Sequence, residues 1–196
     1  MITGIFNFLN QHTTVTEAEF QFLMTKTTIH NFNKKDKITE IAEIENRIYY
    51  IEKGLVRKFF YRDDEEVITQ FVKEGSLISS TASFFSRKPS QYIIEAIEPT
   101  TAFSINYDEL ESIYGQGNKW EKIGRIITTH FLLQQEILMM DNIRLTVKER
   151  FKKFMNENPD LIQRVPQKQL ASYLNIKQET FSRMKHLMYD KSLKTA

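Results

Sequence analysis

The chain of 196 residues contains no cysteine. This excludes disulfide bridges, thiolate zinc sites and cysteine-ligated iron–sulfur clusters, and it agrees with a reducing compartment. No stretch approaches 18 uninterrupted apolar residues, so we expect no membrane span. The N-terminal sequence MITGIFNFLNQHTT lacks a basic start and a long apolar core, and we therefore expect no signal peptide there.

The sequence also lacks the motifs of the common enzyme classes. It contains no P-loop, no dinucleotide-binding glycine motif and no Ser-His-Asp spacing. Between Thr28 and Ile105 the only histidine is His30, whereas a metal-dependent enzyme on a cupin-like barrel needs several His and carboxylate ligands on its strands. We therefore expect no metal site and no enzymatic activity.

Charge is distributed unevenly along the chain, although the net charge is only +2. Residues 144–196 carry 12 Lys and Arg against 5 Asp and Glu, a net charge of +7. The preceding residues carry 15 basic against 20 acidic side chains, a net charge of −5. A basic C-terminal third on an acidic body fits nucleic-acid binding through that third, although a merely solvated basic surface would have the same composition.

The segment from Pro166 to Leu187 has the pattern of two short helices joined by a tight turn. Its apolar residues recur at helical spacing with a change of phase near Asn175, a residue type that tolerates a left-handed backbone. These residues are Leu170, Ala171, Leu174, Ile176, Phe181, Met184, Leu187 and Met188. The second helix carries polar side chains on its outward face, which suit base edges and phosphates. The pattern indicates a helix-turn-helix that binds DNA.

Between residues 28 and 105 the apolar period changes to two, which predicts many short strands. The expected strands are Thr28–Phe32, Lys37–Ile41, Arg47–Glu52, Leu55–Tyr61, Val67–Val72, Tyr92–Ala96 and Thr101–Ile105. Strands of this length and spacing imply a small antiparallel barrel or roll. Short helices are expected before them at Ile5–Leu9 and Glu17–Thr25, the second with a capping box formed by Thr16 and Glu19.

A long helix is expected from Lys119 to about Asn142, and it is apolar on several sides. One stripe with 3/4 spacing consists of Ile123, Ile126, His130, Leu133, Ile137 and Met140, and another set of Trp120, Ile127, Phe131, Leu132, Leu138 and Met139. Such a helix either packs as a coiled coil against the same helix of a second copy or is buried within one subunit. The sequence does not decide which stripe faces a partner. A basic amphipathic helix follows at Thr146–Asn156, with Val147, Phe151, Phe154 and Met155 expected inward.

This order of a β-roll, a long helix and a C-terminal helix-turn-helix resembles the cyclic-AMP receptor protein/Fnr (Crp/Fnr) family of bacterial transcription regulators. The resemblance covers nearly the whole chain and is most specific in RVPQKQLASYLNIKQETFSRMKHL, residues 164–187. It implies an α+β fold: an N-terminal cyclic-nucleotide-binding-like β-roll (jelly-roll) domain at residues 1–117, a dimerisation helix at 118–143, and a C-terminal helix-turn-helix (winged-helix-like) domain at 144–196. Any β-hairpin wing after the second helix is expected to be missing or much reduced.

The resemblance also suggests which residues bind DNA. Gln178, Glu179 and Arg183 fall on the family's recognition-helix pattern, with Gln in place of the first Arg. Glu179 can accept a hydrogen bond from cytosine, Arg183 can donate to guanine, and Lys168 and Lys185 suit phosphates. The full set of expected DNA-binding residues is Gln167, Lys168, Lys177, Gln178, Glu179, Thr180, Ser182, Arg183, Lys185 and His186.

The expected effector pocket departs from the family's cyclic-nucleotide cassette. The family holds the ribose with a Glu and the cyclic phosphate with an Arg, and the matching stretches are Gly75-Ser76-Leu77 and Ser90-Gln91-Tyr92 here. Both charged groups are absent, and a buried phosphate without a cation is poorly compensated. We therefore expect little affinity for cyclic AMP or cyclic GMP, unless Arg57 or Lys58 supplies a cation. The candidate pocket comprises Arg57, Gly75, Ser76, Leu77, Ser90 and Gln91.

The leading interpretation is thus a homodimeric, sequence-specific DNA-binding regulator with a β-roll effector domain. The resemblance implies a palindromic operator, an unknown small-molecule effector and RNA polymerase as partners, no membrane, and a cytoplasmic, nucleoid-associated location in a bacterium. The alternative is a small-molecule-binding sensor module whose C-terminal helices make protein contacts. The basic segment with its polar helix face favours DNA, because a protein-contact hairpin does not need it.

Overall fold

The computed structural model describes residues 3–11 and 13–193, and the side chains of Thr3, of His130 and of residues 188–193 lie outside that description. The chain divides into two compact units. The first contains residues up to 60 and residues 69–131, and the second contains residues 61–68 and those from 132 onward. The expected domain boundaries at 117/118 and 143/144 remain a prediction.

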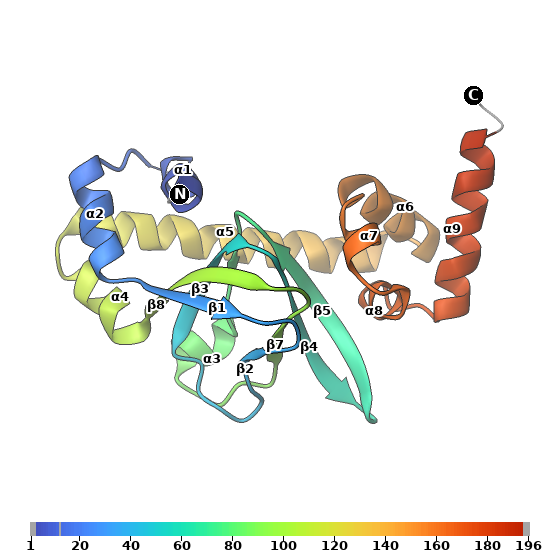
Figure 1. The fold of residues 1–196 in the computed structure, drawn as a ribbon, viewed down its shortest axis with the longest axis horizontal. Coiled ribbons are helices and arrows are strands. Elements are labelled where there is room, and N and C mark those ends of the chain that lie inside the picture. The colour runs from blue at the N-terminus through green and yellow to red at the C-terminus, as the bar shows by residue number, and fades with distance from the viewer. Residues whose placement is uncertain (1–2, 12, 194–196) are drawn as a thin grey trace. The chain divides into compact units, whose positions relative to one another are not determined.

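The first unit is built on a β-roll of two four-stranded sheets, with strand orders β1-β8-β3-β6 and β2-β7-β4-β5 (Figure 1). The strands are β1 (Thr28–Phe32), β2 (Lys37–Thr39), β3 (Arg47–Lys53), β4 (Leu55–Arg62), β5 (Glu65–Lys73), β6 (Leu77–Ile78), β7 (Ile93–Ala96) and β8 (Thr100–Asn106). All seven expected strands are present. The short β6 was not foreseen, since two residues leave no period to detect.

The helices of the described residues are α1 (Thr3–Asn10), α2 (Glu17–Thr25), α3 (Thr81–Ser86), α4 (Tyr107–Tyr114), α5 (Asn118–Arg144), α6 (Val147–Glu157), α7 (Leu161–Arg164), α8 (Gln167–Tyr173) and α9 (Gln178–Leu193). The capping box of Thr16 and Glu19 at α2 is confirmed. Helices α3 and α4 lay within stretches that the sequence had left unassigned.

Consecutive residues of the first sheet pack against different layers because side chains alternate across a strand. Tyr49 and Ile51 face the second sheet and join an interior cluster with Val56 and Ile94. Tyr50, between them, faces the opposite way and belongs to a cluster built with the helices. This sheet is therefore buried on both faces.

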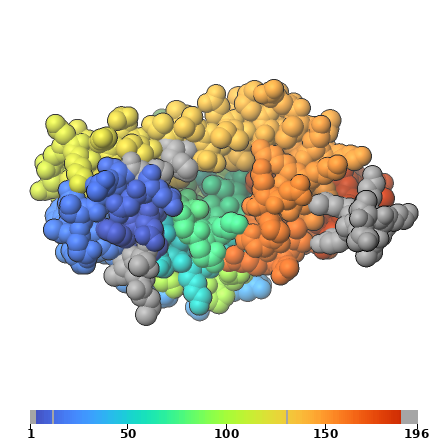
Figure 2. Space-filling view, turned by 90° about the horizontal axis from the view of Figure 1, so that it is seen from above, coloured from blue at the N-terminus to red at the C-terminus, as the bar shows by residue number. Residues whose placement is uncertain are grey.

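Helices α1, α2 and the first half of α5 cover the outer face of that sheet. The rings of Phe22 in α2 and Trp120 in α5 lie 5.9 Å apart, and Lys119 forms an ion pair with Glu19. The space-filling view shows the N-terminal residues in blue directly against the yellow start of α5 (Figure 2). The long helix thus begins inside the apolar packing of the first unit.

Candidate functional site

The second unit builds a helix-turn-helix on a small apolar core. Thr146 caps α6 together with Glu149, whose pKa is lowered by hydrogen bonds from the Thr146 side chain and backbone. Phe151 packs edge-on against Phe181 of α9 with ring centroids 5.3 Å apart, and both rings are buried. Val147 was expected inward but is 38% exposed, because it lies in the first turn of its helix.

The turn between α8 and α9 is fixed by backbone hydrogen bonds. Asn175 has a φ of 54°, the left-handed conformation expected from its residue type. Its N–H donates to the carbonyl of Ser172 at 3.0 Å, and the N–H of Ile176 donates to that of Ala171 at 3.0 Å. These two bonds form a Schellman motif, which ends α8 and sets the direction of α9.

The solvent face of α9 is polar along two adjacent rows. Residues four apart share a face of a helix, which aligns Gln178, Ser182 and His186 in one row and Glu179 and Arg183 in the next. All of them are exposed except Ser182, which is half-buried. Positive partial charge at the start of a helix adds to the attraction that this end has for phosphate.

The remaining expected DNA-binding residues lie around this face. Lys168 and Lys177 are exposed, whereas Gln167, Thr180 and Lys185 are half-buried. Leu187 was expected to belong to the apolar side of the helix, yet it is 58% exposed. It continues the row of Glu179 and Arg183 by one turn, so it borders the polar face.

A β-hairpin tip belongs to the same unit and contacts α8. Asp63 and Asp64 form its two-residue turn with φ values of 51° and 62°, as a type I′ turn requires. The hydroxyl of Ser172 donates to the carbonyl of Glu66 at 2.7 Å and accepts from the N–H of Ile68 at 3.1 Å. The backbone of the hairpin tip is therefore hydrogen-bonded to a side chain of α8, the first helix of the helix-turn-helix.

The tip and the motif enclose a groove of about 910 Å³. Its walls include Asp64, Glu65 and Glu66 from the tip, and four of the expected DNA-binding residues. Those four are Lys168, Lys177, Gln178 and Glu179. Acidic and basic side chains thus share one groove at the start of α9.

In the first unit, the candidate effector residues do not all face the interior of the β-roll. Arg57 pairs in register with Glu95, one position away from Val56 and Ile94, which face the interior. Its side chain therefore lies on the outer face of the sheet, where its guanidinium binds the Glu95 carboxylate at 2.9 Å. It is not positioned to hold a ligand inside the roll.

Of the other candidate residues, Ser90 contacts Ser80, the residue that precedes α3. Ser90 is buried, and its hydroxyl donates to that of Ser80 at 2.8 Å, whereas Ser76 and Gln91 are exposed. Gly75 has a φ of 83° and donates its N–H to the carbonyl of Ile51 at 2.9 Å. Leu77 points to the opposite side of its sheet, toward the helices.

A buried carboxylate that sequence reasoning missed lies at the same place. The Glu45 carboxylate accepts hydrogen bonds from the Thr39 hydroxyl, from the Arg47 N–H at 3.0 Å and from the Ser80 N–H at 3.5 Å. Its own N–H donates to the hydroxyl of Ser83 at 2.9 Å. A negative charge of the chain itself therefore occupies the start of α3, where a bound phosphate would meet repulsion.

Lys58 is one of the cations beside the start of α3, together with Arg87, whose guanidinium donates to the Glu45 carbonyl at 3.0 Å. The Lys58 ammonium donates to the carbonyl of Ser79 at 3.0 Å and lies 4.5 Å from the centre of the Tyr92 ring. Burial lowers the pKa of Lys58 to about 8, although the Glu45 carboxylate partly opposes the shift. Lys58 thus already has three neighbours that compensate its charge.

Comparison with known proteins assigns the fold. Residues 29–116 match the family described as the cyclic nucleotide-binding domain, and no curated protein matches the chain. FixK2 from Bradyrhizobium japonicum shares 22% sequence identity, with 85% of this chain and 86% of that chain covered and a TM-score of 0.71. The c-di-GMP responsive global regulator CLP of Xanthomonas campestris shares 15%, over 90% and 93%, with a TM-score of 0.70. The catabolite activator protein of Thermus thermophilus shares 13%, over 92% and 86%, with a TM-score of 0.58.

The described residues were also searched for membrane-spanning helices and for metal-ion sites. None of the helices in that part of the chain is long and apolar enough to cross a membrane. Within the same residues, no group of three or more His, Asp or Glu side chains is placed to hold a metal ion.

Proposed function

We propose that this chain, which contains a cyclic nucleotide-binding domain and has the fold of the Crp/Fnr regulators, is a homodimeric transcription regulator that binds DNA through α8 and α9. The single observation that carries the proposal is the polar face of α9, set by the Schellman turn at Asn175. In this proposal α9 enters the major groove, and two copies read a palindrome with half-sites on the order of 34 Å apart.

The proposed contacts divide into two kinds. Glu179 and Arg183, adjacent in one exposed row, read base edges together with Gln178. Lys168 and Lys185 lie at the edges of the face and bind phosphates. The remaining expected residues, Gln167, Lys177, Thr180, Ser182 and His186, complete the interface.

The proposed dimer forms through the second half of α5. In this half, six large apolar side chains are between 38% and 69% exposed. They are Leu132, Leu133, Ile137, Met139, Met140 and Ile143. Two overlapping stripes thus form one broad apolar surface, which is costly to leave in water and suits a second copy of the same helix.

Light scattering tests the dimer. Leu133→Glu combined with Ile137→Glu places two charges in the apolar surface, and we expect a monomer. Gln134→Glu, on the same helix but outside the surface, is the matched control and should remain a dimer. A folded double variant that is still dimeric would contradict the proposed interface.

The proposed regulator does not use cyclic AMP or cyclic GMP. The warrant is the Glu45 carboxylate at the start of α3 and the outward position of Arg57. Calorimetry with either nucleotide at micromolar concentration should give no saturable heat. Tight binding with a defined stoichiometry would overturn this statement, and Lys58 would then be the first candidate for the cation that binds the phosphate.

DNA binding itself is tested by footprinting the purified protein across its own genome. We expect protected palindromes with a common half-site. The alternative function, a sensor module whose C-terminal helices contact a protein, is favoured by one observation, the exposed Leu187 beside Arg183. Absence of any protected site, together with uniform weak binding to all duplexes, would favour that alternative.

A further inference from the structure

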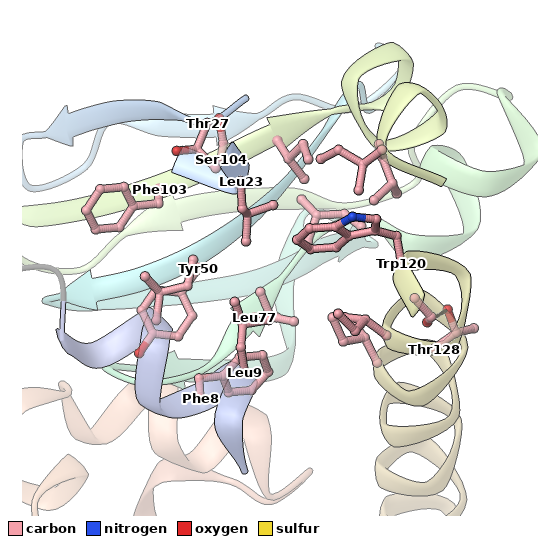
Figure 3. A pocket seen from close by; sticks show the side chains of 18 of the residues that line it. Phe8, Leu9, Leu23, Thr27, Tyr50, Leu77, Phe103, Ser104, Trp120 and Thr128 are labelled. Carbon is pink, nitrogen blue, oxygen red and sulfur yellow. Dashed lines mark hydrogen bonds between the residues drawn. The ribbon is translucent and has the colours of Figure 1, made fainter. Parts of the chain in front are cut away.

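An apolar cavity of about 110 Å³ lies in the first unit, outside the β-roll interior. It is bordered by α1, α2, α3, α4, α5 and the outer face of the sheet that contains β3, β6 and β8, and it is open to solvent on one side. Figure 3 shows Leu23, Tyr50, Leu77 and Trp120 pointing into it from three of these sides. Since Tyr50 and Leu77 face away from the roll interior, this cavity is separate from the cyclic-nucleotide region.

The described walls offer no charge to a ligand. Among the described residues that line the cavity, none is Asp, Glu, Lys, Arg or His. Burial raises the pKa of Tyr50 to about 12 and raises that of Tyr114 as well, so both phenols are uncharged at neutral pH. A phosphate or another ion would therefore lose its hydration in this cavity without compensation.

Two threonine hydroxyl groups at the wall already have partners inside the protein. Those of Thr27 and Thr128 donate to the carbonyls of Met24 and Gly124 at 3.0 and 2.9 Å, whereas the side chain of Ser104, which pairs in register with Tyr49, faces the roll interior. Water needs two to four polar partners to occupy a cavity, and these groups leave it few. The cavity therefore favours an apolar occupant over water.

The shape of the cavity is fixed by close packing around it. The phenol of Tyr114 lies directly against the α5 backbone at Gly124, where any side chain would collide with it. Phe8 and Tyr50 are tilted against each other with ring centroids 5.6 Å apart. Phe85 and Thr128, both exposed, mark the side on which the cavity approaches solvent.

From this geometry we propose that the cavity is a binding site for an uncharged apolar molecule about the size of one aromatic ring. An apolar cavity of about 150 Å³, lined by Leu, Ile and Phe, stays dry and accepts benzene or xenon, and the present cavity is of similar size and lining. Aromatic walls add favourable edge and face contacts to a ring. The site stands on the first unit alone, so it does not depend on DNA binding.

Trp120 makes the proposal directly testable, because it is the only tryptophan of the chain and lines the cavity. Its side chain is only 8% exposed, so a charged quencher in solution such as iodide should leave its fluorescence unchanged. Xenon under pressure should instead quench it along a saturable curve with one site per chain. Benzene should compete with xenon and restore the fluorescence.

Two variants fill the cavity. Leu77→Phe and Ile127→Phe each add volume at its wall, and each should weaken xenon binding by about tenfold or more. Ile41→Phe, at an exposed position away from the cavity, is the matched control and should bind like the parent. Melting curves show which of the two filling variants is folded, and one folded variant is sufficient.

The outcomes separate clearly. Saturable quenching that benzene reverses and that a folded filling variant loses supports the site. Quenching that rises linearly with xenon, or that is the same in parent and filling variant, overturns it. Quenching by xenon that benzene does not reverse also overturns it, because the cavity would then not accept a ring.

Discussion

Two groups of charged and polar side chains in this chain have opposite environments, because one is bonded within the protein and the other faces solvent. At the start of α3, Glu45, Lys58, Ser80 and Ser90 are held by hydrogen bonds to other groups of the protein. On α9, glutamate, arginine, glutamine and histidine side chains face solvent. The comparison shows that residue type alone does not identify a recognition site. Polar groups with internal partners stabilise the fold, whereas exposed ones remain free to bind something else.

The comparison makes a general prediction about variants. Substitutions at the start of α3 should change the free energy of unfolding and leave DNA affinity nearly unchanged. Substitutions on the face of α9 should do the reverse. Four experiments test this division, and they follow from the largest expected effect to the smallest.

Glu45→Ala should give the largest effect. It removes a buried carboxylate and leaves the Thr39 hydroxyl and two backbone N–H groups without their acceptor. Breaking a buried charged network of this kind costs about 3–5 kcal/mol of unfolding free energy. Urea unfolding measures it, with Glu43→Ala at a nearby exposed position as control. Equal stability of the two variants would show that the α3 cluster does not hold the fold.

Lys58 should make stability depend on pH. Its folded pKa of about 8 lies below the ordinary value of 10.5 because the site is buried. The folded protein thus binds this proton less tightly than the unfolded chain, and the unfolding free energy rises between these two pH values. The expected gain from pH 7 to pH 10.5 is about 3 kcal/mol.

Lys58→Met should lack that gain, because it has no proton to release at this position. Lys53→Met, an exposed substitution on β3, should keep it. Urea unfolding of the three proteins at several pH values provides the comparison. If the unfolding free energy of the parent and of Lys58→Met changed with pH in the same way, the charged form of Lys58 would not be destabilised by burial.

Sequence reasoning worked where a pattern repeats. Period-two alternation located seven strands, and the phase change at Asn175 located the turn of the helix-turn-helix. It failed where a contact joins distant segments. The Glu45 carboxylate meets Ser80, 35 positions away, and no local signal marks either residue as a partner.

The cavity illustrates the same limit with apolar residues. Tyr49-Tyr50 and Ala102-Phe103 place apolar side chains on both faces of a sheet, which indicates that both faces are covered. That signal was available in the sequence. Whether the covering helices fill the space completely depends on packing, which periodicity does not describe.

Arg183→Ala should change DNA binding without changing stability, because the side chain is exposed. If Arg183 donates to a guanine, the variant should lose about 1–3 kcal/mol of binding free energy and relax the preference at one base pair per half-site. Binding isotherms on the operator and on each single-base variant of it measure this. An unchanged preference at every position would place Arg183 outside base recognition.

Lys185→Ala should give the smallest effect and a different kind of effect. Lys185 is half-buried at the edge of the polar face, beside the row of Gln178 and Ser182. In the proposed complex we therefore expect it to contact a phosphate rather than a base edge. Its loss should weaken binding to the operator and to a scrambled duplex by the same factor. Because one phosphate contact releases about one counterion, the slope of log affinity against log salt should fall by about one. Isotherms on both duplexes over a range of salt concentrations separate this from Arg183→Ala, which should act mainly on the operator. If both variants bind both duplexes as the parent does, α9 is not the recognition helix, and a protein partner becomes the better explanation of its polar face.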